Sequence, residues 1–303
     1  MFDGEEFTIG QDMLRQTRST SAARNQASAG TPGRLATTAS ALGIAAAAVA
    51  TGNVGTLLRV VGSCAMLGVG LIGCACAGLY AFNKLAAPER RNKLIATYMP
   101  VVMRGLDRNM REVRAELLKG ISGKVLDLGA GSGTYFKYIN KPAVTEWVGI
   151  EPMEELHAEL QKSIDNAQRQ RSVGFETRVV GDFIDSLVAA ESGTFDAIIL
   201  GNVLCEVPEP IGDNLAVVHR LLKPRGRCYF SEHVYDSEHW WRAALQVLVH
   251  PWWVVVSGGC NCNRCQLEAI EACFGRENVC SWTLYAGSFP WTARFEVGLC
   301  VRR

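Results

Sequence analysis

The sequence has no acidic residue between Asp12 and Glu89, and it carries almost no excess of either charge over its whole length. The formal net charge of the 303 residues is +1, so no basic surplus favours nucleic-acid binding. Charged residues make up only 20% of the chain and hydrophobic residues 48%, which excludes an intrinsically disordered protein. The 11 cysteines lack the regular spacing of a small secreted domain, and they indicate mostly free thiols in a reducing compartment.

Residues 1–59 are expected to form an N-terminal extension. Four arginines stand among Ser, Thr, Ala and Gly between residues 15 and 34, a composition typical of an organelle transit peptide. The start of the chain is acidic, which is typical of a disordered tail instead, so both interpretations stay open. The uncharged stretch 35–58 is rich in Ala and Thr, and it could be a first membrane span, the end of a transit peptide or a linker.

A run of 23 residues without a charge, 60–82, predicts a transmembrane helix. At about 1.5 Å rise per residue it is long enough for a hydrocarbon core of about 30 Å. Its many Gly, Ala and Cys residues suit close helix packing in lipid, whereas a buried helix of a soluble protein would be destabilised by the glycines. Residues 83–120 are then expected to form a linker and an amphipathic helix, and residues 121–303 a globular domain.

Strand and helix patterns alternate in residues 121–303, which predicts an α/β domain. This alternation implies right-handed crossovers and a doubly wound, mostly parallel sheet, with ligands at the carboxyl ends of its strands. The last two strands are expected to complete one sheet edge as an antiparallel pair. The predicted strands are 124–128, 147–150, 177–180, 197–200, 227–232, 281–285 and 294–301, and the predicted helices are 95–118, 154–169, 184–190 and 214–222.

The first predicted strand runs into a glycine-rich loop that contains Gly129, Gly131 and Gly133. Glycines let the backbone turn tightly and lie close to a ligand. A loop of this kind alone would also fit a dinucleotide, but the dinucleotide fingerprint G-x-G-x-x-G requires a glycine where Thr134 stands. The spacing therefore favours a different ligand.

Carboxylates stand at the ends of three successive strands, at Asp127, Glu151 and Asp182. Carboxyl ends of parallel strands meet at one edge of the sheet, so these side chains are expected to face one site. They would repel a pyrophosphate. A cationic sulfonium cofactor without a phosphate would tolerate them.

The segment Asp-Leu-Gly-Ala-Gly-Ser-Gly at 127–133, together with Glu151 and Asp182, resembles the class I S-adenosylmethionine-dependent methyltransferases. The resemblance implies a Rossmann-like sheet with S-adenosylmethionine as cofactor. It also implies that the glycine loop passes the amino-acid end of the cofactor, that Glu151 holds the ribose hydroxyls, and that Asp182 with Phe183 reaches the adenine. The implied cofactor-binding residues are Asp127, Gly129, Gly131, Gly133, Glu151, Asp182, Phe183 and Asn202, the last of which would lie under the cofactor.

Shorter motifs between residues 95 and 300 narrow the resemblance to the methyltransferase-like seven proteins, the membrane-anchored alkyl thiol methyltransferases. They include Tyr98-Met-Pro100, Val203-Leu-Cys205, Glu232-His-Val234 and Gly259-Cys260. The resemblance implies methylation of a small hydrophobic acceptor, a thiol, at the membrane of the endoplasmic reticulum or a lipid droplet. The extension before residue 60 is longer than the family pattern, so a mitochondrion or a plastid stays an alternative. Arg225 also departs from the pattern, because it replaces a glycine in the turn before the fifth strand.

His233, next to Glu232 at the end of the fifth strand, is the candidate catalytic residue. A thiol acceptor with a pKa of about 8.5 benefits from a base or a positive neighbour that favours the thiolate. The alternative is a structural histidine that holds a loop. The Trp-rich stretch 239–253 could line a pocket for an apolar acceptor, lie at a membrane interface, or pack on the sheet as an ordinary helix.

The cysteines at 260, 262 and 265 form a C-x-C-x-x-C cluster. Structural zinc needs four ligands, usually in regular pairs, and this spacing is irregular. No metal site is therefore predicted; free thiols are the main interpretation of the cluster, and a metal or a redox disulfide is the alternative.

Two further functions compete with a methyltransferase. A membrane-anchored assembly or interaction protein could keep the cofactor pocket without turnover. A dehydrogenase would use the same kind of sheet with a dinucleotide. The glycine loop and all three carboxylates argue for a protein that binds S-adenosylmethionine.

Overall fold

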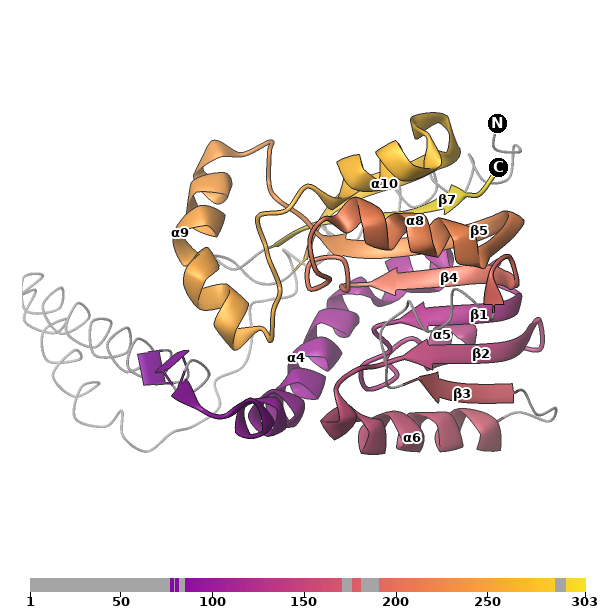
Figure 1. Ribbon diagram of the computed structural model, residues 1–303, viewed down its shortest axis with the longest axis horizontal. Helices are drawn as coiled ribbons and strands as arrows, with labels where there is room; N and C mark the ends of the chain where they lie inside the picture. Colours follow the sequence, from indigo (N-terminus) through magenta and orange to yellow (C-terminus); the bar gives the residue numbers. More distant parts are fainter. Residues whose placement is uncertain (1–76, 79, 82–84, 171–175, 181–190, 287–292) are drawn as a thin grey trace, which may run out of the picture. The chain divides into compact units, whose positions relative to one another are not determined.

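The computed structural model describes residues 77–303 except 79, 82–84, 171–175, 181–190 and 287–292 (Figure 1). The described residues from Ala87 on belong to one compact unit, and those before it belong to a second unit, Thr17–Ala86. The predicted transmembrane segment 60–82 and the extension before it lie almost wholly outside the described residues. Among the residues that are described, no helix is both long enough and apolar enough for a membrane span. The boundaries expected after residues 59, 82 and 120, between the extension, the membrane helix, the linker with its helix and the globular domain, stay predictions.

A seven-stranded sheet with helices on both faces forms the described domain (Figure 1). The strand order is β3-β2-β1-β4-β5-β7-β6; the first five of these are parallel, and β7 runs antiparallel to both β5 and β6. This confirms the mostly parallel, doubly wound sheet and its antiparallel edge. The strands are β1 (Gly123–Leu128), β2 (Val144–Ile150), β3 (Glu176–Val180), β4 (Phe195–Gly201), β5 (Leu222–His233), β6 (Val279–Ala286) and β7 (Ala293–Val301).

The helices agree with most of the predicted ones. The helix expected over 184–190 lies outside the described residues, and the one expected over 95–118 begins earlier, at Pro88. Proline is favoured at the first position of a helix, where its missing N–H costs nothing. The helices are α4 (Pro88–Leu117), α5 (Phe136–Ile139), α6 (Glu154–Arg169), α8 (Ile211–Leu221), α9 (Trp240–Val256) and α10 (Gln266–Phe274).

Successive side chains of the strands enter two separate cores, as on β1, where Val125 faces one core and Leu126 the other. Helices α4, α5 and α6 cover the first core, and α8 and α10 cover the second. Burial on both faces explains why the central strands are almost continuously apolar. Each fully buried aliphatic side chain contributes about 1.5–3 kcal/mol.

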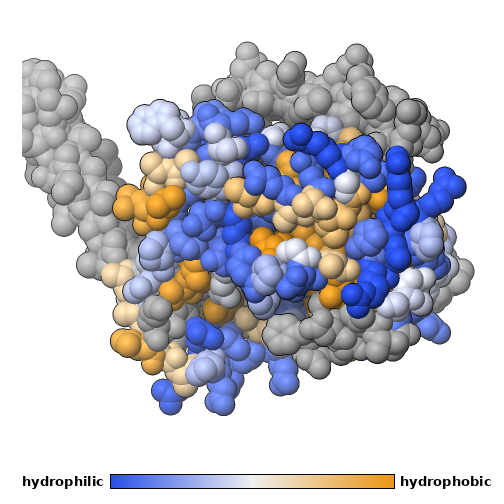
Figure 2. Space-filling view, turned by 45° about the horizontal axis from the view of Figure 1, so that its top comes forward, coloured by the Kyte–Doolittle hydropathy of each residue, from blue (hydrophilic) through white to orange (hydrophobic). Residues whose placement is uncertain are grey.

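Helix α9 lies beyond the carboxyl ends of the parallel strands, toward which their arrowheads point (Figure 1). Its outer side chains are apolar: Trp240 is 82% exposed and Leu248 77% exposed. In Figure 2, hydrophobic side chains gather at the left of the described surface, where α9 lies. The single formal charge of the helix is Arg242. Its guanidinium lies over the rings of Trp241 and Tyr285.

Candidate active site

A cavity of about 320 Å³ lies at the carboxyl ends of β1, β2 and β4. This is where an open, doubly wound sheet binds its ligand. Helix α4 contributes one wall, and the loop after α9 contributes another. The described lining includes Ile95, Met99, Met103, Arg114, Leu128–Ser132, Glu151–Met153, Gly201–Val203, Glu206, Ser257 and Gly258.

The predicted glycine loop lies at this cavity. Gly129 and Gly131 both have a left-handed backbone, with φ of 70° and 56°. A Cβ atom on Gly129 would stand 2.8 Å from Cγ2 of Val203, whereas a Cβ atom on Gly131 would stand 3.9 Å from the Gly129 carbonyl oxygen, an ordinary van der Waals distance. Gly133 is outside the described lining, because it packs against α6, where a Cβ would stand 2.7 Å from Cβ of Ser163. The first two glycines therefore shape the cavity, and the third seats the loop on α6.

Glu151 is a fixed carboxylate in the cavity wall. Its Oε2 accepts a hydrogen bond from the Gly131 N–H at 2.7 Å, and its Oε1 accepts one from the Met153 N–H at 2.8 Å. Burial raises the pKa of Glu151, and the two backbone donors oppose that rise. A carboxylate offers about four lone-pair sites, so two remain for hydroxyl groups of a ligand.

Asp127 lies beneath the cavity and is outside its described lining. It is 1% exposed, and neither carboxyl oxygen accepts a hydrogen bond of good geometry from the described residues. Burial raises its pKa to about 7; the carboxylate of Glu151 adds to the rise, and the nearby indole of Trp147 opposes it.

Asn202 lies at the end of β4 in the cavity wall, as predicted. Its φ is 60°, and its backbone N–H donates to the Ser231 carbonyl at 3.0 Å. The side-chain amide nitrogen is buried, and no described residue accepts a hydrogen bond from it. An unsatisfied buried donor in a cavity wall is costly unless a ligand or water satisfies it.

Arg114 is a cavity residue that the sequence analysis missed. Its side chain is buried, its Nη1 lies 3.2 Å from Oδ1 of Asp107, and its guanidinium stands 4.9 Å from the ring centroid of Tyr135. A guanidinium held in this way can bind a ligand carboxylate through a charge-assisted pair. The pattern of α4 revealed an amphipathic helix, but no local signal showed that one of its arginines faces a ligand site.

His233 stands at the end of β5, as predicted, but outside the described lining of the cavity. Its ring is stacked on Phe295, with centroids 5.5 Å apart, and meets Trp253 of α9 edge-on at 6.3 Å. Its Nδ1 lies 3.7 Å from Sγ of Cys260. The neighbouring Glu232 is fully buried and accepts a hydrogen bond from the Val203 N–H at 3.0 Å, so it supports the loop after β4.

The remaining predicted residues divide into two groups. Asp182 and Phe183 lie outside the described residues. In the cysteine cluster, Cys260 and Cys262 are buried, Cys265 is exposed, and all three are free thiols. No set of three or more His, Cys, Asp or Glu side chains in the described part of the chain gathers as a metal site.

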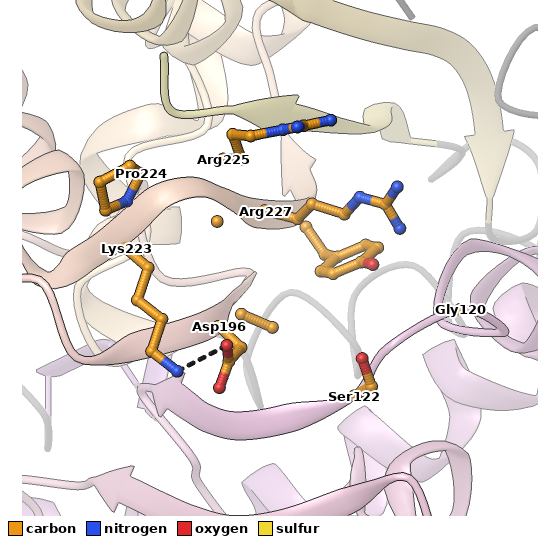
Figure 3. A pocket seen from close by; sticks show the side chains of 10 residues that line it. Gly120, Ser122, Asp196, Lys223, Pro224, Arg225 and Arg227 are labelled. Atoms are coloured by element: carbon orange, nitrogen blue, oxygen red, sulfur yellow. Dashed lines mark hydrogen bonds and ion pairs between the residues drawn. The ribbon is translucent and has the colours of Figure 1, made fainter. Parts of the chain in front are cut away.

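A second hollow, of about 250 Å³, lies at the opposite end of the sheet (Figure 3). Lys223 and Asp196 form an ion pair of 2.7 Å in its wall, while Arg225 and Arg227 extend together to the other side. Arg225 has a φ of 65°, which explains why the family pattern has glycine there. The hollow borders the amino ends of β4 and β5, away from the ends where such sheets bind ligands.

The cavity at the carboxyl ends fits S-adenosylmethionine by the chemistry of its walls. Arg114 offers a cation to a carboxylate, Glu151 offers acceptors to hydroxyls, and the amide of Asn202 lacks a partner among the described residues. Gly131 lines the cavity without a side chain, which allows the ligand to lie against the backbone.

A family model of the methyltransferase domain matches residues 102–278. The chain belongs to this family. Human thiol S-methyltransferase TMT1B is 30% identical over 182 residues, which are 59% of this chain and 72% of that protein. Human thiol S-methyltransferase TMT1A is 33% identical over 156 residues, 50% of this chain and 60% of that protein. The methyltransferase-like seven resemblance is thereby confirmed, and the protein is an S-adenosylmethionine-dependent methyltransferase.

Among solved structures, a SAM-dependent methyltransferase of Methanosarcina mazei aligns with 59% of this chain and with 92% of its own chain. The sequence identity is 14% and the TM-score 0.46.

Proposed function

We propose that this methyltransferase transfers the methyl group of S-adenosylmethionine to a small hydrophobic thiol at a membrane surface. The observation that carries the acceptor class is the similarity to two proteins named thiol S-methyltransferase, one of them over 72% of its length. The cofactor supplies a methyl group already activated by its sulfonium. The protein's own task is to align the acceptor with that group and to favour its thiolate.

In this proposal the cofactor residues take the roles that the family resemblance implies. Glu151 holds the ribose hydroxyls, and Gly129 and Gly131 lie along the amino-acid end of the cofactor. From the structure we add Arg114, which can form an ion pair with the carboxylate at that end. By the same resemblance Asp127 and Gly133 also belong to the cofactor site, and Asn202 lies under the cofactor. Asp182 and Phe183 are proposed for the adenine by resemblance.

His233 is proposed as the base that takes the proton of the acceptor thiol. Its place at the end of β5, beside Trp253, supports this role. His233→Ala should slow turnover of thiols with a pKa well above the assay pH, and matter little for thiols that are already ionised. An equal loss for both kinds of thiol would assign His233 to packing instead.

The membrane surface is proposed from two features of the chain. The uncharged run 60–82 is long enough for a span, and α9 exposes Trp240, Trp241, Val247 and Leu248. Tryptophan is favoured at the boundary between lipid and water. By resemblance, we propose the endoplasmic reticulum or a lipid droplet as the location.

The acceptor class is tested with methyl-labelled S-adenosylmethionine against matched hydrophobic thiols, phenols, amines and lipids. Labelled thioethers as the main products would support the proposal. Turnover of amines or lipids but of no thiol would refute the thiol assignment and leave the methyltransferase intact.

A further inference from the structure

A thiol and an imidazole meet where the end of β5 contacts the loop after α9. Cys260 is 7% exposed, and its Sγ lies 3.7 Å from Nδ1 of His233. The two rings that contact His233, Phe295 and Trp253, are stacked on it and edge-on to it. These contacts fix the plane of the imidazole with Nδ1 facing the sulfur. The second ring nitrogen, Nε2, points away from the sulfur.

The backbone around Cys260 is tied to the loop after β4. Both the backbone N–H and the side-chain amide of Asn261 donate to the carbonyl of Cys205, at 2.9 and 3.0 Å. The Cys260 N–H donates to Oγ of Ser257 at 3.1 Å. Ser257 and Gly258 line the cavity, so the segment that carries Cys260 continues directly from the cavity wall.

Hydrogen-bond donors around Cys260 favour an anionic sulfur. A hydrogen bond from the Cys205 thiol is the largest cause that lowers the pKa of Cys260 well below its usual value, and His233 lowers it further against the effect of burial. The other titratable groups that face Cys260 are Glu206, Glu232 and Cys262. All three are anionic or neutral. The Trp253 indole also lowers the pKa of Cys260 as a donor, but among the three donors only the imidazole can carry a positive charge.

We propose that Cys260 is a positioning residue for His233, and that its sulfur accepts the Nδ1–H so that Nε2 is the nitrogen that takes the acceptor's proton. A buried carboxylate holds the histidine of a serine hydrolase in the same way. In the proton step the acceptor S–H bond breaks, the proton moves to Nε2, and the electron pair stays on the acceptor sulfur. The resulting imidazolium is stabilised by the Cys260 sulfur. This inference rests on the proposed role of His233.

The first test compares turnover of Cys260→Ala, Cys260→Asp and Cys262→Ala. Cys262 is the matched control, because it is also buried in the same loop but bonds to the Gln246 carbonyl. With a thiol of pKa well above the assay pH, Cys260→Ala should lose about tenfold or more in kcat, part of what general-base catalysis contributes. Cys260→Asp should retain most of the rate, and Cys262→Ala should match the wild type. With an acidic thiol, all four proteins should be similar.

The second test needs no turnover. In nitrogen NMR of the imidazoles, with His233 assigned by a His233→Gln spectrum, the wild type should show the Nδ1–H tautomer and Cys260→Ala a mixture. An Nε2–H tautomer in the wild type, or equal losses with Cys260→Ala for acidic and weakly acidic thiols, would overturn the inference. A protein that methylates no thiol would contradict the proposed function, while the NMR result would still decide the pairing.

Discussion

The backbone N–H of Gly131 donates a hydrogen bond to Oε2 of Glu151 over 2.7 Å, and this bond ties the glycine loop after β1 to the end of β2. It brings together the two parts of the chain that the sequence analysis assigned to one cofactor. The bond also holds the carboxylate in the orientation in which its remaining lone pairs are available to the cavity.

Replacing Glu151 with Gln should weaken S-adenosylmethionine binding by about tenfold to a hundredfold, because hydrogen bonds to a charged group contribute about 1.5–3 kcal/mol. Glu154→Gln, an exposed site in the first turn of α6, is the control. Calorimetric titration of both folded variants measures the effect. Unchanged affinity in Glu151→Gln would remove Glu151 from the cofactor site.

The buried carboxyl of Asp127 should make the cofactor-free protein less stable as the pH rises. Its folded pKa of about 7 is above the ordinary value of 3.8, so the folded state retains a proton that the unfolded state has released. Stability then falls between about pH 4 and pH 7. Asp127→Asn should raise the free energy of unfolding near pH 8, on the order of 2 kcal/mol, and change it little at pH 4. Denaturant unfolding at the two pH values checks this, and an equal change at both would contradict it.

Arg225→Gly should stabilise the fold by about 1 kcal/mol, because a left-handed backbone costs a side chain about that much. The backbone hydrogen bond from Arg225 to Arg302 is kept in the variant. Arg225→Lys, which keeps the strained φ, is the control and should leave the melting temperature unchanged. A melting temperature of Arg225→Gly at or below that of the wild type would show that the arginine side chain stabilises the turn by more than the backbone costs.

The apolar surface of α9 should contribute to lipid binding. Changing Trp240 and Leu248 together to Gln should reduce co-sedimentation with phosphatidylcholine vesicles, since both side chains are exposed and would leave the lipid interface. Arg276→Gln, at an exposed site on another part of the domain, serves as the control. Vesicle binding that is identical in all three proteins would exclude α9 from the membrane surface.

The sheet could be predicted because its signals are local. Apolar runs of strand length and the patterns between them predict every described strand, and the glycine motif marks the tight turn at Gly129 and Gly131. Asn202, whose φ is also positive, has no such local signal. The site beyond these motifs depends on tertiary packing. Arg114 reaches the cavity because α4 packs on the sheet, and Cys260 meets His233 only because α9 folds back between them. The spacing of the residues along the sequence therefore predicts neither contact.

A single-turnover reaction tests the central claim most directly. Protein in excess over methyl-labelled S-adenosylmethionine is mixed with a hydrophobic thiol, and the bound label is followed by mass spectrometry. We expect one labelled thioether for each cofactor consumed, at a rate reduced by Glu151→Gln under conditions where that variant is only partly saturated. A cofactor that stays bound and intact in the presence of the thiol, and of the other acceptor classes, would contradict the account and favour a binding protein without turnover.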